Sequence, residues 1–142
     1  MKRTIRALLL IMTVSLFTVS CSETTRNTIA VSGKWQLTRT VLTENGEVVY
    51  DKYAVQEDRS IFYEFNSNNE LVQTIITSKG TDIHLGRWLV DEDILVLSFA
   101  EDSQTFHIEK TSLLEMVLSE SYTENGKNYV YTITLRSYSE KK

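Results

Sequence analysis

The sequence of 142 residues contains no proline, one cysteine, two histidines and five glycines. Without proline, every residue keeps a backbone N–H that can donate to a β-ladder. A single cysteine excludes a disulfide within the chain, so a folded domain must depend on its apolar core alone. The apolar residues also show little of the 3.6-residue period of a helix, so we expect mainly β-structure.

Positive charge is scarce as well. Lysine and arginine number 15 against 19 aspartates and glutamates, a formal net charge of −4. Lys2, Arg3 and Arg6 lie within the first 20 residues, which contain no acid, so the remaining residues carry a net charge of −7. An acidic domain of this kind argues against nucleic acid as a partner.

One long apolar run is present, from Ala7 to Val19, and it follows the basic residues at the start of the chain. It is shorter than the roughly 20 apolar residues that a membrane-spanning helix needs. A basic start followed by a short apolar run is typical of a signal peptide. We therefore predict that residues 1–20 are a signal peptide and do not belong to the folded domain.

Cys21 follows directly after Thr18-Val19-Ser20, an arrangement that resembles the lipobox of bacterial lipoproteins. The resemblance implies that Cys21 is lipidated and becomes the first residue of the mature protein. Ser22 stands where an aspartate would signal retention in the inner membrane, which implies a cell-envelope lipoprotein of the outer membrane, facing the periplasm or the surface. Residues 21–32 are rich in Ser, Thr and Asn, and we expect a lipidated polar tether without a helix.

The rest of the chain alternates apolar and polar residues with a period of two. Turn signals such as Glu44-Asn45-Gly46 and Glu124-Asn125-Gly126 separate about nine short strands. This pattern predicts an all-β, antiparallel domain over residues 33–138. In the last strand one face carries Tyr129, Tyr131, Ile133 and Leu135, and we expect it to point inward because it buries the larger apolar area.

Short motifs occur in a fixed order along this domain: Gly33-x-Trp35, Tyr63-Glu64-Phe65-Asn66, Gly86-x-Trp88, Phe106-x-Ile108 and Met116-x-Leu118. The ordered set resembles the lipocalin-like lipoproteins of Gram-negative bacteria over residues 31–138. The resemblance implies an up-and-down antiparallel barrel of eight to nine strands that holds a small apolar or amphipathic molecule. It also implies a structural signature of Gly33, Trp35, Gly86, Trp88 and Arg136, with the arginine lying across the first tryptophan.

Two functions remain open at this stage. In the first, the barrel binds a small ligand through Trp35, Trp88, Tyr129 and Tyr131. In the second, the barrel is packed solid and acts as a protein-interaction module, such as a protease inhibitor or a subunit of an envelope complex. His84, His107 and Asp82 form only a weak zinc set, and no serine lies in a Gly-x-Ser-x-Gly motif. We therefore expect no catalytic residue, no enzyme activity, no cofactor and no metal.

The lipid anchor is directly testable. Cys21→Ser should move the protein from the membrane fraction to the soluble fraction, because the thiol is the predicted attachment point of the acyl chains. The measurement is cell fractionation with a carbonate wash. A variant that stays in the washed membranes would contradict the lipoprotein interpretation.

Overall fold

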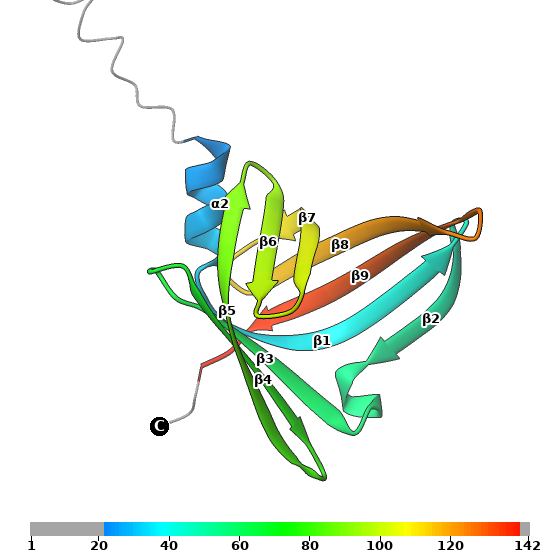
Figure 1. Ribbon diagram of the computed structural model, residues 1–142, viewed down its shortest axis with the longest axis horizontal. Coiled ribbons are helices and arrows are strands. Elements are labelled where there is room, and N and C mark those ends of the chain that lie inside the picture. Colours follow the sequence, from blue (N-terminus) through cyan, green and yellow to red (C-terminus); the bar gives the residue numbers. More distant parts are fainter. Residues whose placement is uncertain (1–21, 140–142) are drawn as a thin grey trace, which may run out of the picture.

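The computed structural model describes residues 22–139, and the predicted signal peptide and Cys21 lie outside this part of the chain (Figure 1). The predicted all-β, antiparallel fold is confirmed. The elements are α2 (Glu23–Val31), β1 (Gly33–Glu44), β2 (Glu47–Tyr53), η2 (Ala54–Gln56), β3 (Arg59–Phe65), β4 (Glu70–Thr77), β5 (Gly80–Asp91), β6 (Ile94–Phe99), β7 (Ser103–Thr111), β8 (Glu115–Glu124) and β9 (Lys127–Ser137). Within residues 22–139 no helix has the length and apolar character to cross a membrane.

Strand β1 closes the barrel because it pairs with three other strands. Residues 33–36 pair with β3, residues 39–44 pair with β2, and the opposite edge of β1 pairs with β9. The other neighbours follow sequence order from β3 to β9. An up-and-down barrel of eight strands results, and β2 is a ninth strand that flanks one half of β1.

A β-bulge in β1 changes which side chains point inward. The register against β9 shifts between Leu37 and Arg39, so that Thr38 is the extra residue. The Thr38 hydroxyl donates to the carbonyl oxygen of Thr134 at 3.0 Å, which ties the bulge to β9. Leu37 is buried before the bulge and Thr40 after it, whereas Arg39 points outward with its guanidinium partly exposed.

The apolar core fills the half of the barrel in which β1 begins. Trp35 and Trp88 are each only 3% exposed. The indole of Trp35 donates to the carbonyl oxygen of Val31 at 2.8 Å, and that of Trp88 donates to Asn66 at 2.9 Å. The ring of Phe65 meets Trp88 edge-on, with centroids 5.5 Å apart. Both tryptophans therefore fill this end of the barrel with their apolar bodies and satisfy their single polar group there.

Gly86 is required by a close approach of β5 to β6. A Cβ atom at this position would lie 2.5 Å from the carbonyl oxygen of Ser98 and 2.9 Å from the ring of Phe99. Gly33 is required for another reason, because its backbone φ of +133° is one that residues with a side chain rarely adopt. The two glycines that precede the tryptophans in the sequence therefore have different physical roles.

The polar segment before the barrel is a packed helix, so the expectation of a tether without a helix is wrong. Ser22 caps the first turn of α2, and Val31 at its end is fully buried. Asn27 is 4% exposed and donates from Nδ2 to the carbonyl oxygen of Glu92 at 2.8 Å. The Thr24 hydroxyl accepts from the backbone N–H of Glu92 at 2.8 Å. Polar composition suggested solvation, but these side chains have specific partners in the β5–β6 turn.

The last strand points the predicted face inward. Ile133 and Leu135 are buried, and Tyr131 packs against the core. Val130 and Arg136 lie on the opposite, exposed face. The large side chains of this face thus fill the inside of the barrel, as their larger apolar area predicted.

Removal of the first tryptophan should strongly destabilise the fold. Trp35→Ala deletes a fully packed indole and its hydrogen bond, and we expect the free energy of unfolding to fall by about 3–5 kcal/mol. Val130→Ala on the outer face is the control and should change it by less than about 0.5 kcal/mol. Chemical denaturation measures both, and equal stability of the two variants would contradict the packing described.

Candidate ligand site at the open end of the barrel

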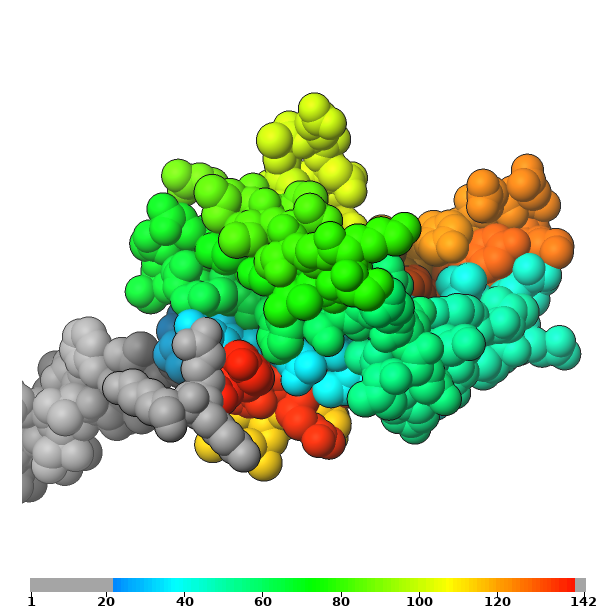
Figure 2. All heavy atoms as spheres, turned by 90° about the horizontal axis from the view of Figure 1, so that it is seen from below, coloured from blue at the N-terminus to red at the C-terminus, as the bar shows by residue number. Residues whose placement is uncertain are grey.

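The barrel opens at the end away from the tryptophans. Strand β5 pairs with β6 only from Gly86 to Asp91, so residues 80–85 pair with β4 alone. Residues 120–124 of β8 likewise pair with β9 alone. Two projections diverge from the closed part: the β3–β4–β5 sheet, and an arm formed by β2 with the adjoining halves of β1, β8 and β9 (Figure 1). In Figure 2 the orange tip of this arm stands apart from the yellow-green β6–β7 hairpin.

Hydrogen-bonding side chains gather where the two projections meet. Tyr50 of β2 donates to Glu57, which follows η2. Arg59 at the start of β3 donates from Nε to the other carboxylate oxygen of Glu57 at 3.0 Å. The charges on Arg59 and Glu57 also influence the pKa of Tyr131 on β9. Tyr50, Glu57, Arg59 and Tyr131, called the mouth cluster below, therefore come from β2, from the segment that leads into β3, and from β9.

The mouth cluster has a defined ionisation state at neutral pH. The hydrogen bond from Tyr50, with that from Arg59, holds the pKa of Glu57 below its ordinary value. The same bond raises the pKa of Tyr50, and burial raises the pKa of Tyr131. Glu57 is therefore a carboxylate, whereas both tyrosines keep their protons and can donate or accept hydrogen bonds.

Partly buried apolar side chains pack against the filled core. They are Ile75, Phe99 and Tyr131, and Phe99 also lines the side groove that contains His84. Tyr63 is 8% exposed, and its hydroxyl accepts a hydrogen bond from Gln73 at 3.2 Å. A molecule that entered the open end would meet apolar side chains below and hydrogen-bonding groups at its rim, and the filled core would stop it from going deeper.

The four predicted ligand residues do not form one site, which corrects the sequence-based expectation. Trp35 pairs with Ser137 and Glu44 pairs with Tyr129, so Trp35 and Tyr129 lie nine residues apart along β1. At about 3.3 Å per residue this separation is roughly 30 Å. Trp35 and Trp88 lie in the core, and only Tyr131 belongs to the mouth cluster. The alternation through Ile61 and Tyr63 would have placed Arg59 on the inward face, and Tyr50 lies near a strand end where a tyrosine can form part of a mouth, but no pattern indicated Glu57.

Tyr129 is hydrogen-bonded and stacked at the tip of the arm. Its hydroxyl donates to one carboxylate oxygen of Glu44 at 3.0 Å, and Lys127 contacts the other at 2.6 Å. These two partners lower the pKa of Glu44. The ring of Tyr129 stacks on Tyr122 with centroids 5.1 Å apart. Tyr129 therefore holds the β1 and β9 tips together instead of lining the mouth.

Arg136 does not lie across Trp35, and this part of the predicted signature is wrong. It is exposed and pairs with Gln36 on the outer face, where it lines a groove of about 600 Å³ together with Arg39. The cation–π contact that the structure shows within residues 22–139 is Arg39 over Tyr53, at 5.3 Å. Because Arg136 follows the buried Leu135, the alternation of β9 turns its side chain outward.

The two histidines have different surroundings. His84 lines a side groove of about 440 Å³ between β5 and the β6–β7 hairpin. His107 contacts Asp93 at 2.6 Å through Nε2. Within the part of the chain that the structure describes, no three metal-ligating side chains come together.

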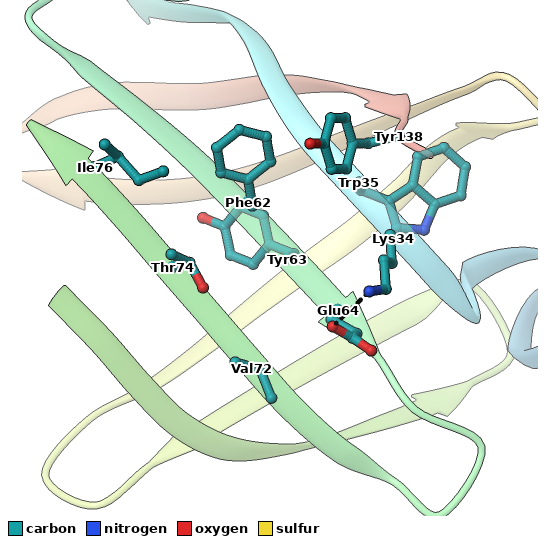
Figure 3. A pocket seen from close by; sticks show the side chains of 9 residues that line it. All are labelled: Lys34, Trp35, Phe62, Tyr63, Glu64, Val72, Thr74, Ile76 and Tyr138. Carbon is teal, nitrogen blue, oxygen red and sulfur yellow. Dashed lines mark ion pairs between the residues drawn. The ribbon is translucent and has the colours of Figure 1, made fainter. Parts of the chain in front are cut away.

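A further groove of about 180 Å³ lies on the outer face of β3 and β4 (Figure 3). The ring of Phe62 approaches that of Tyr138 with centroids 5.0 Å apart, and Lys34 pairs with Glu64 at 3.4 Å. Val72, Thr74 and Ile76 line its other side. This groove is outside the barrel wall and is separate from the open end.

No family model matches the chain, and no curated protein matches its sequence. Among solved structures, lobster apocrustacyanin A1 aligns with a TM-score of 0.52 and 14% identity, over 82% of this chain and 65% of that chain. The fold is lipocalin-like. Apocrustacyanin C2 gives the same figures, and the bovine lipocalin allergen Bos d 2 aligns over 80% of this chain and 79% of its own at 12% identity and a TM-score of 0.47. At these identities the likeness concerns the fold alone.

Glu57 should make the lipocalin-like barrel sensitive to acid. Because its folded pKa is depressed, its contribution to stability is complete above its ordinary pKa and is lost as the pH falls through the folded value. Glu57→Gln should therefore flatten the fall in melting temperature between about pH 5 and pH 3. Glu124→Gln on the exposed tip is the control. Equal pH profiles for the native chain and Glu57→Gln would contradict the ionised cluster.

Proposed function

We propose that the protein is a non-enzymatic lipoprotein of the cell envelope, anchored through lipid on Cys21, whose barrel binds a small amphipathic molecule at its open end. The mouth cluster above a filled apolar core is the observation that carries this proposal. The lipobox resemblance supports the anchor and the outer-membrane location, and the lipocalin-like fold is compatible with a binding barrel.

The arrangement favours a small ligand over a long one. The core below Tyr131 is filled by buried side chains, among them Leu37, Ile133 and Leu135. The ligand therefore rests on partly buried apolar side chains such as Ile75 and directs its polar group toward the mouth cluster. Two carboxylates act on this region, that of Glu57 and that of Glu120, a residue that pairs with Tyr131 between β8 and β9. The cations Arg59 and Lys52 offset them, so a neutral polar group fits better than a charged one.

Binding of an apolar fluorescent probe tests this site. The neutral amine N-phenyl-1-naphthylamine should bind saturably to the purified protein with increased emission. Tyr131→Ala removes aromatic contact area and a hydroxyl from the mouth, and we expect the dissociation constant to rise about tenfold, equivalent to about 1.4 kcal/mol. Val130→Ala, the outward neighbour on the same strand, is the matched control. Equal binding by both variants would place the probe elsewhere.

The second candidate function is a protein-interaction module, and one observation favours it. The outer face of β4 and β5 exposes Ile76, which lines the groove of Figure 3, and Ile83 and Leu85 on the neighbouring strand. The adjacent residues 80–85 also leave one backbone edge of β5 without a strand partner. A partner strand or apolar segment fits such a surface. A purified protein that carried a partner chain and no small molecule would favour this function.

A further inference from the structure

Three apolar side chains are exposed at the closed end of the barrel. Leu113 and Leu114, in the turn between β7 and β8, are 92% and 73% exposed, and Ile29 on α2 is 69% exposed. Ile29 and Leu113 line the same groove of about 330 Å³, so the helix and the turn present them together. We call Ile29, Leu113 and Leu114 the apolar tip. Large apolar residues that are this exposed and this close together typically mark an interaction site.

The turn holds its two leucines outward by specific hydrogen bonds. The backbone N–H of Ser112 donates to the carbonyl oxygen of Glu115 at 2.9 Å, and the N–H of Glu115 donates to the Ser112 hydroxyl at 3.0 Å. The carbonyl oxygen of Leu114 accepts from the N–H of Ser137 at 2.9 Å. The leucines are therefore presented by a turn fixed to the end of β9, and they do not fold back onto the core.

The charged residues beside the apolar tip are paired with opposite charges. Arg26 and Lys34 line the groove beside Ile29 and Leu113, and no acid lines it. Arg26 contacts Glu23 at 3.3 Å and Lys34 contacts Glu64 at 3.4 Å. Exposed apolar side chains without an excess of negative charge beside them fit a lipid surface.

The predicted anchor leaves no slack between this surface and the membrane. Cys21 is bonded to Ser22, and Ser22 already caps α2. Ile29 lies seven residues along the helix from Ser22, a rise of about 10 Å. With a packed helix in place of a flexible tether, the closed end of the barrel must lie next to the lipid to which Cys21 is attached.

We propose that Ile29, Leu113 and Leu114 insert into the surface of the membrane that carries the lipid on Cys21. This inference rests on the anchoring in the proposed function. It deepens that function, because the closed end of the barrel then faces the lipid surface and the open end is directed away from it. A ligand would be exchanged with the aqueous compartment or with a facing protein, and not directly with the anchoring bilayer.

Fluorescence quenching by lipid tests the orientation. The full lipidated chain is reconstituted in vesicles of phosphatidylethanolamine and phosphatidylglycerol, with and without a lipid that carries a nitroxide high in its acyl chain. An environment-sensitive fluorophore is placed on Leu113→Cys or Ile29→Cys, and on Glu124→Cys at the opposite end of the barrel as the matched control. All three positions are exposed, so the fold should tolerate the label. Acylated Cys21 cannot react with the dye.

Vesicle flotation, mass spectrometry and quenching separate the outcomes. We expect the protein to float, with blue-shifted emission and several-fold stronger nitroxide quenching at positions 29 and 113 than at position 124. A protein that floats with equal quenching at all three positions overturns the docked orientation but leaves the anchor intact. A blue shift at position 113 without quenching means that a second copy or another protein covers the apolar tip, which also overturns it. A chain that does not float and takes dye at Cys21 contradicts the anchor itself, and the orientation with it.

Discussion

The β1–β9 ladder is the constraint on which the rest of the structure depends. It runs from the pair Trp35–Ser137 to the pair Glu44–Tyr129 and therefore joins the filled end of the barrel to the tip of the arm. The bulge at Thr38 divides this ladder into two parts. Before the bulge, β1 pairs with β3 and closes the packed part of the barrel. After the bulge, β1 pairs with β2 and extends the open arm. A single strand thus determines both where the core ends and where the open region begins.

Much of the fold could be predicted from the sequence, because burial on one face of a strand imposes a period of two and turns require Asn and Gly. The inward face of β9 and the two structural tryptophans follow from these rules. The rest depends on contacts that the local pattern does not encode. Thr38 shifts the alternation of β1, the pairing of Asn27 with Glu92 turns a polar segment into a packed helix, and Tyr50 meets Glu57 only because η2 turns the chain back.

These departures change the functional account more than the fold. The four aromatic residues expected to bind a ligand lie in three different places: the two tryptophans in the core, Tyr129 at the tip of the arm and Tyr131 in the mouth cluster. Only Tyr131 therefore belongs to the proposed ligand site. The mouth cluster is built from side chains that bond one another and is shallow because the core beneath it is full. Under the proposed attachment through Cys21, the packed helix brings the closed end of the barrel to the membrane. The proposed ligand site and the proposed anchor then lie at opposite ends of the barrel.

Native mass spectrometry of the lipidated protein, extracted mildly from its own cell envelope, tests the central claim of a small-molecule site most directly. The account predicts a mass above that of the acylated chain by one small amphipathic molecule, released on gentle activation while the barrel stays folded. A complex with another protein chain and no small-molecule adduct would contradict it and would favour the protein-interaction function instead.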